Sequence, residues 1–300
     1  MRSGITGSWK PFNFMRPSLL NYSAPKKIDE LWSLIEQYGD EGKILAGGQS
    51  LMPLLNLRLA APKAVIDLRH LNVFSGISLE EEFLRIGSTT TQHVVEKDEF
   101  VNRKMPIVAL ATSFIGHPQI RNRGTFGGSI AHADPSSELP ALAVALNCKI
   151  LAISKSEERV IDATDFFTGP YTTDLRAGEV LKEIRIPIAD PSIQFGFYEI
   201  ARCSGAFAMA GAVSATRFSD DGLVDSIRIG LFGVGSKPLL FTFDVNTFGS
   251  DVLSPKLISL IAGIVRDAVN PMEDAQVTAN QRRHYASVVV ERSLQAGSLV

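Results

Sequence analysis

The chain has 300 residues, of which 45% are hydrophobic and 21% are charged, and its formal net charge is -2 at pH 7. This length indicates two or three subdomains, each with enough apolar sequence to form its own core. The near-neutral charge offers no basic field for nucleic acid or anionic lipid, which argues against these two classes of partner.

Neither end of the chain carries a predicted targeting or membrane segment. The N-terminal stretch "MRSGITGSWKPFNFM" lacks the apolar core of a secretory signal, and "LISLIAGIVRDAV" is too short and too interrupted to span a bilayer. We therefore expect a cytoplasmic protein without a membrane span. Cys148 and Cys203 are too few for a disulfide framework, a zinc site or an iron-sulphur cluster, so no metal site is predicted in this chain.

The first elements alternate between helices and short apolar strands. The pattern predicts a helix that ends before Gly39, with Ser23 as its cap and Pro25 in the first turn. A strand over 43–46 leads to a pair of glycines and then to a second helix over about 50–59. Further strands are predicted over 64–68 and 83–88.

The later part of the chain changes from helices to strands. An apolar helix is predicted over 105–116, and another begins with Asp134 as cap and Pro135 in the first position. Strands follow over 148–154, 158–163, 179–187, 195–203, 210–218 and 223–234, and two helical patterns close the chain after Pro255. This order predicts an α+β fold with mixed sheets and a domain boundary between 168 and 178.

Two glycine-dense stretches carry the clearest functional signal, "AGGQS" over 46–50 and "TFGGS" over 125–129. Glycine lets a ligand approach the main chain, where consecutive amide N–H groups can bind an anion, so both stretches are candidates for holding a diphosphate. The alternative is that both are plain tight turns. The Walker and Rossmann signatures are absent, which argues against nucleotide hydrolysis and standard NAD binding.

Other polar residues near these stretches have two interpretations each. His132, and also His117 before Pro118, are more typical of hydrogen-bonded structural histidines than of ligands or bases. Arg121 and Arg123 either neutralise phosphate charge or form a solvated pair. No motif for a nucleophile or a catalytic metal is present, so we predict no catalytic residue.

Four stretches together resemble a known family: "AGGQSLMPLLNLRLAAP", "IGHPQIRNRGTFGGSIAHADPSSELPA", "FFTGPYTT" and "EVLKEIRIP". They are similar to the FAD-binding medium subunit of the molybdenum hydroxylases, a group with carbon monoxide dehydrogenase and the flavin domain of xanthine dehydrogenase. The resemblance implies a p-cresol methylhydroxylase-type (PCMH-type) FAD-binding fold over 1–175, with two α/β subdomains over 1–68 and 69–175. A C-terminal flavoprotein domain over 176–300, an antiparallel sheet with helices, follows.

The resemblance also implies which residues contact FAD. The two glycine stretches hold the diphosphate, an acidic side chain at Glu138 accepts hydrogen bonds from ligand hydroxyls, and the neighbourhoods of Leu181 and Tyr198 line the isoalloxazine ring. The implied contact residues are Leu45, Ala46, Gly47, Gly48, Gln49, Ser50, Leu51, Ile115, His117, Thr125, Gly127, Gly128, Ser129, Asp134, Glu138, Leu181 and Tyr198.

In this family the flavin subunit works within a larger enzyme. The resemblance therefore implies a small partner subunit with two-iron two-sulphur clusters and a large partner subunit with the molybdenum cofactor, in a dimer of heterotrimers. FAD would take electrons from the clusters and pass them to an external acceptor. Two alternatives stay open: a free-standing FAD oxidase or reductase of related fold, and a scaffold subunit that holds no cofactor.

Overall fold

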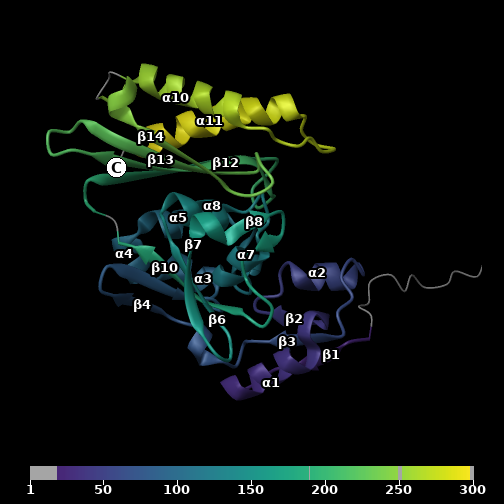
Figure 1. Cartoon of the computed structure of the whole chain (residues 1–300). Coiled ribbons are helices and arrows are strands. Elements are labelled where there is room, and N and C mark those ends of the chain that lie inside the picture. The colour runs from purple at the N-terminus through teal and green to yellow at the C-terminus, as the bar shows by residue number, and fades with distance from the viewer. Residues whose placement is uncertain (1–18, 189, 249–251, 298–300) are drawn as a thin grey trace, which may run out of the picture.

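The computed structural model describes residues 19–188, 190–248 and 252–297. The chain folds into three parts in sequence order: an N-terminal part, a middle part, and a C-terminal sheet that two long helices cover (Figure 1). The predicted α+β class, with an antiparallel C-terminal sheet and helices, is confirmed. Every helix within the described ranges is too short or too polar to cross a membrane.

The N-terminal part is a three-stranded parallel sheet in the order β1 (Asn21–Ser23), β3 (Ala64–Asp67), β2 (Gly42–Leu45). Helix α1 (Ile28–Tyr38) buries Leu31 and Trp32. The predicted cap at Ser23 is wrong, because Ser23 belongs to β1 and the helix begins five residues later. Helix α2 (Leu51–Asn56) ends before residue 59, where Arg58 takes a positive φ of 57°.

The middle part contains a five-stranded sheet whose neighbouring strands are all antiparallel. Its order is β4 (Ile77–Glu80), β5 (Phe83–Gly87), β10 (Val180–Pro187), β6 (Lys149–Ile153) and β7 (Glu158–Asp162). The central strand β10 lies beyond the expected division after residue 175. A domain boundary that keeps this sheet in one domain would therefore follow Pro187. The position of the boundary stays a prediction.

Short helices connect the strands of the middle part. They are α3 (Gln92–Lys97), α4 (Glu99–Lys104), α5 (Pro106–Phe114), α6 (Pro118–Arg121), α7 (Phe126–His132), α8 (Glu138–Ala145) and α9 (Ala163–Phe166), with the two-stranded ribbon β8 (Phe167–Gly169) and β9 (Thr172–Thr173). The apolar helix predicted over 105–116 is confirmed as α5. The predicted helix start at Asp134 is wrong: its Oδ1 accepts from the backbone N–H of Ser136 in a turn, and α8 begins at Glu138.

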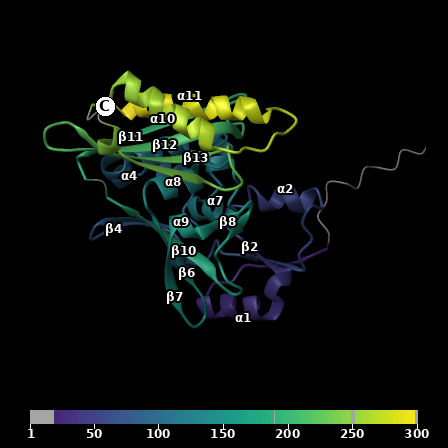
Figure 2. The ribbon, with the colours of Figure 1, turned by 45° about the horizontal axis from the view of Figure 1, so that its top comes forward.

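The C-terminal sheet is antiparallel in the order β11 (Ile193–Ala201), β12 (Ala208–Phe218), β13 (Val224–Phe232) and β14 (Leu239–Asp244). Helices α10 (Pro255–Ala268) and α11 (Ala279–Gly297) cover one face, and α5 and α8 lie on the other (Figures 1 and 2). All eight residues of α8 are buried as a result. Single-turn 3-10 helices complete the described chain, over Gly39–Glu41, Asn72–Phe74 and Val245–Phe248.

Candidate functional site

A cleft of about 600 Å³ lies where the three parts meet, a volume typical of a small-molecule site. The loop between β2 and α2, helix α7, the start of α8, the start of β10 and the loop before β12 form its walls. All predicted contact residues except His117 and Tyr198 line it: Leu45, Ala46, Gly47, Gly48, Gln49, Ser50, Leu51, Ile115, Thr125, Gly127, Gly128, Ser129, Asp134, Glu138 and Leu181.

The β2–α2 loop presents unused hydrogen-bond donors to this cleft. Among the described residues, no acceptor is bonded to the backbone N–H groups of Gly47, Gly48, Gln49 and Ser50. Gly48 has a φ of 75°, which turns the chain so that consecutive amides can converge on one point. Such a run of free N–H groups binds anions, so this loop is suited to a phosphate group.

The second glycine pair differs from the first because it lies within helix α7 rather than in a loop. Thr125 is the N-cap residue, and its Oγ1 accepts from the N–H of Gly128 at 3.0 Å. The N–H groups of Phe126 and Gly127 donate to the carbonyl oxygens of Thr90 and Ser88. The backbone N–H groups from Phe126 to Ser129 are thus satisfied within the protein, whereas no acceptor among the described residues is bonded to the N–H of Thr125.

Close packing of the protein explains two of the glycines. A Cβ at Gly47 would lie 2.2 Å from the carbonyl oxygen of Arg123, and a Cβ at Gly127 would lie 2.5 Å from Cα of Ser88. Both distances are far below van der Waals contact, so no other residue fits at either position. Gly47 allows the N-terminal part to pack closely against the segment before α7. Gly127 allows α7 to pack closely against Ser88, at the end of β5.

Two buried polar atoms in the cleft wall have no hydrogen-bond partner within the described residues. They are Oγ of Ser88 and Oε1 of Gln92. Neither residue was predicted from the sequence, since an isolated serine or glutamine carries no motif. Because buried polar groups are rarely left unpaired, these two atoms mark where a bound ligand would complete the hydrogen bonding.

The carboxyl group of Glu138 lies at the first residue of α8 and is 7% exposed. Its pKa is raised to about 8, mainly by burial and in smaller part by the nearby charges of Glu199 and Asp134, against a backbone hydrogen bond that lowers it. At neutral pH the group is therefore mainly a carboxylic acid. It can both donate to and accept from a ligand hydroxyl, whereas the sequence suggested a carboxylate that only accepts.

An aromatic pair lies at the edge of the cleft. The rings of His132 and Tyr171 have centroids 5.1 Å apart, and the Tyr171 hydroxyl is 3.5 Å from Oδ2 of Asp134. The backbone N–H of Tyr171 donates to the carbonyl of Ala133, and both residues have positive φ. Burial lowers the pKa of His132. Tyr171 was missed as a site residue, although it belongs to the stretch "FFTGPYTT".

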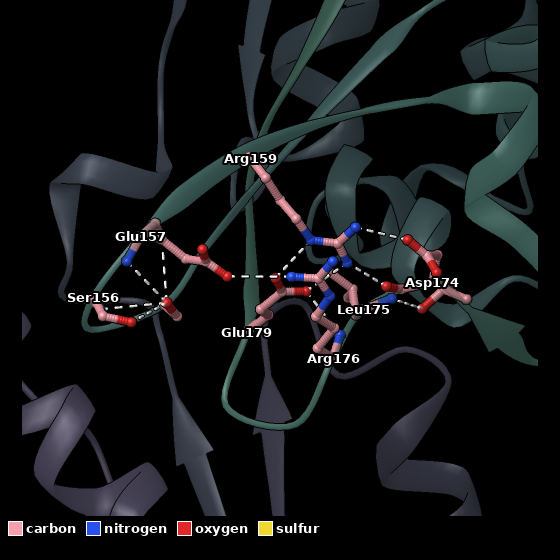
Figure 3. A network of polar contacts seen from close by, with 9 residues as sticks. Ser156, Glu157, Arg159, Asp174, Leu175, Arg176 and Glu179 are labelled. Carbon is pink, nitrogen blue, oxygen red and sulfur yellow. Dashed lines mark hydrogen bonds and ion pairs between the residues drawn. The ribbon is translucent and has the colours of Figure 1, made fainter.

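An ion-pair network holds the wall that contains Leu175 and Glu179 (Figure 3). The Arg159 guanidinium on β7 donates from Nε and Nη2 to Glu179 and from Nη1 to Asp174, at 2.7, 2.8 and 2.7 Å. Arg176 in the same loop pairs with Glu157. The network fixes the segment before β10, and so positions Leu181 in the cleft.

The two predicted contact residues outside the lining have different positions. His117 precedes α6 and packs against the loop before β12. A Cβ at Gly205 of that loop would lie 2.5 Å from Cε1 of His117. Tyr198 is on β11 and is 39% exposed. Phe207, in the loop before β12, lines the cleft instead.

The lining groups fit the FAD that the sequence resemblance implies. Free amides suit its diphosphate, the buried acid and the orphaned polar atoms suit its hydroxyls, and Ile115, Leu175 and Leu181 offer apolar surface to a ring. No group of three or more His, Cys, Asp or Glu side chains within the described residues is arranged to hold a metal ion.

Two family models match the chain, one over each of two consecutive segments, and both describe the same group of enzymes. Residues 13–189 match the FAD binding domain in molybdopterin dehydrogenase, and residues 196–296 match the CO dehydrogenase flavoprotein C-terminal domain. The chain is 33% identical to the caffeine dehydrogenase subunit beta of Pseudomonas sp. (strain CBB1), over 93% of this chain and 95% of that one.

Two solved structures show the same fold over nearly the whole chain. A chain of the carbon monoxide dehydrogenase of Hydrogenophaga pseudoflava superposes with a TM-score of 0.89 at 32% identity, over 95% of this chain and 99% of that one. A chain of quinoline 2-oxidoreductase from Pseudomonas putida 86 superposes with a TM-score of 0.86 at 30% identity, also over 95% and 99%. The chain therefore belongs to the family of FAD-binding medium subunits of molybdopterin dehydrogenases, and is the flavin subunit of an oxidoreductase of that family.

Proposed function

We propose that the chain binds one FAD noncovalently in the cleft and serves as the electron-output subunit of a molybdenum hydroxylase. Bound FAD would supply the redox chemistry of this subunit, which takes electrons from the iron-sulphur clusters of a partner and delivers them to an external acceptor. The chain's own residues bind and orient the cofactor. This role explains why the cleft needs no nucleophile and no catalytic metal.

The observation that carries the proposal is the run of four free amides from Gly47 to Ser50, in a loop that lines the same cleft as the buried acid of Glu138. The diphosphate would lie on these amides, with Thr125 and Ser129 contributing their hydroxyls. The remaining proposed contacts are Leu45, Ala46, Leu51, Ile115, Gly127, Gly128, Asp134 and Leu181 from the cleft lining, and His117 and Tyr198 from outside it.

The other cofactors of such an enzyme would be held by partner chains. Four cysteine thiolates hold a two-iron two-sulphur cluster, and this chain has only Cys148, which is buried, and Cys203. We propose a small iron-sulphur subunit and a large molybdenum subunit as partners, in a dimer of heterotrimers. The relatives are named for caffeine, carbon monoxide and quinoline, so the substrate would be selected in the large subunit rather than here.

The test is an absorption spectrum of the purified chain, with and without added FAD and after release of bound flavin by heat. We expect a flavin spectrum and about one FAD per chain, since one cleft of this volume holds one dinucleotide. A protein that takes up no FAD, alone and after co-expression with its partner chains, would contradict the proposal and favour a scaffold. Turnover of a substrate by the isolated chain would instead favour a free-standing flavin enzyme.

A further inference from the structure

Two acidic side chains, Glu138 and Glu199, are buried or half-buried where the middle part meets the C-terminal sheet. Glu138 begins α8 and lines the cleft, whereas Glu199 lies on β11. Glu199 is two residues from Phe197, so both side chains lie on the same face of the strand. Phe197 packs on Phe114 of α5, with ring centroids 4.8 Å apart, which places this face toward the middle part. The electrostatic effect of Glu199 on Glu138 agrees with that position.

Neither carboxyl group has a cationic partner within the described residues. Oε2 of Glu199 is buried without a hydrogen bond, and no side chain of the described residues is hydrogen-bonded or ion-paired to Glu138. Two arginines on neighbouring elements are engaged elsewhere. Arg228 of β13 donates to the carbonyls at the opposite end of α8. Arg282 of α11 pairs with Asp274 and donates to the carbonyls of Met209 and Gly233, while its Nε is buried without a partner among the described residues.

The remaining titratable groups around Glu138 add negative charge or none. Asp134 raises its pKa further, Tyr171 is bonded to Asp134, and burial favours the neutral form of His132. Burial also raises the pKa of Glu199, to about 7. Two unpaired carboxylates in such surroundings would be costly, so the pair retains protons at a pH where exposed carboxyls are ionised.

On the basis of the proposed FAD site, we propose that Glu138 and Glu199 together hold at least one proton when FAD is bound, and that this proton tunes the affinity of the cleft for a dianionic ligand. The diphosphate of FAD carries two negative charges, and each ionised carboxylate nearby would repel it. FAD therefore binds more tightly to the protonated pair. By linkage, binding at alkaline pH takes up protons from solution.

The experiment measures FAD binding to the full chain by fluorescence quenching between about pH 6 and pH 9, together with proton uptake by calorimetry in two buffers of different ionisation enthalpy. We expect the Kd of the unmodified chain to rise with pH, at most about tenfold per pH unit for each proton, with net proton uptake near pH 8. In the double variant Glu138→Gln/Glu199→Gln both side chains stay neutral. Its Kd should change less than about twofold over this range, without proton uptake.

The outcomes separate this inference from the proposed function. An unmodified chain that binds FAD with a constant Kd and no proton uptake would overturn the acid pair but leave the FAD site intact, and this holds even if the double variant fails to fold. A double variant that keeps the full pH dependence would assign the proton to other groups. A chain that binds no FAD at any pH would contradict the proposed function itself.

Discussion

The backbone carbonyl oxygen of Arg123 stands 2.2 Å from where the Cβ of any side chain at Gly47 would lie. This contact joins the β2–α2 loop of the N-terminal part to the segment that leads into α7. The free amides of the first loop and the cap of α7 therefore keep their relative positions only while residue 47 is glycine.

The substitution Gly47→Ala should separate these two segments. We expect loss of FAD binding and a loss of stability of about 1–3 kcal/mol, the usual range for overpacking. Retained flavin and the thermal midpoint measure the two effects. Gly263→Ala in α10 is the matched control, since nothing lies within 4 Å of its Cβ and alanine in a helix raises stability by about 0.5–1 kcal/mol. Normal flavin content in Gly47→Ala would show that the contact does not shape the site.

Two substitutions at Gly48 test whether the same loop binds a negatively charged group. Both Gly48→Asp and Gly48→Asn introduce a side chain of similar size at a φ of 75°, and asparagine and aspartate tolerate this region better than other residues. Only the aspartate places a negative charge beside the proposed diphosphate site. We expect FAD to bind the Asp variant at least about 100-fold more weakly than the Asn variant, because a unit charge at this range costs about 3–4 kcal/mol. Equal affinities, measured by equilibrium titration, would place the diphosphate elsewhere.

Thr125 caps α7 through the bond from the Gly128 N–H. Thr125→Val has nearly the same shape but no acceptor, so it should lower stability by about 1 kcal/mol and weaken FAD binding. Thr125→Ser keeps the acceptor and should behave like the unmodified chain in both denaturation and flavin titration. A valine variant of unchanged stability would mean that water replaces the cap.

Local patterns gave the long elements of the fold correctly. The apolar helix α5 and the strands β11 to β13 were predicted, because apolar runs of suitable length mark buried elements. Helix starts were less predictable. Ser23 and Asp134 are good caps by residue type, yet a strand pairs with the first and a turn uses the second. Those outcomes depend on distant neighbours, which no local pattern records.

The candidate site was predictable where the chain carries a motif. The glycine stretches mark the β2–α2 loop and α7, but the sequence did not show that Gly47 and Gly127 are required by protein backbone rather than by ligand contact. Ser88 and Tyr171 were missed for a similar reason. They reach the cleft from separate elements that only the tertiary fold brings together.

The guanidinium of Arg159 should stabilise the cleft wall that contains Glu179, although Arg159 itself does not line the cleft. Arg159→Lys keeps the charge but loses the planar fork that bonds Glu179 and Asp174 together. Because the Glu179 side chain is 3% exposed, we expect a loss of about 1–3 kcal/mol and weaker FAD binding. The control Arg176→Lys changes an arginine that is 63% exposed and should have little effect on either quantity. Equal thermal midpoints for the two variants would show that the network does not position the wall.

The buried acids also predict how stability depends on pH without any ligand. The pKa values of Glu138 and Glu199 in the folded chain, about 8 and about 7, lie above the ordinary value of 4.5. The folded chain therefore binds these protons more tightly than the unfolded chain, so stability falls as the pH rises above 4.5 and levels off once it exceeds about 7 for Glu199 and about 8 for Glu138. The lowered pKa of His132 acts at more acidic pH, below its usual 6.5.

Raising the pH from about 6 to about 9 should thus lower the free energy of unfolding by an amount of the order of 2 kcal/mol from Glu138 alone. Glu138→Gln should remove that part of the pH dependence. Glu36→Gln, at a side chain that is 60% exposed on α1, is the control and should retain the dependence. Thermal midpoints of the three proteins across this range provide the measurement. A Glu138→Gln profile parallel to that of the unmodified chain would mean that Glu138 is ionised in the folded protein, and would remove the physical basis for a proton on the acid pair.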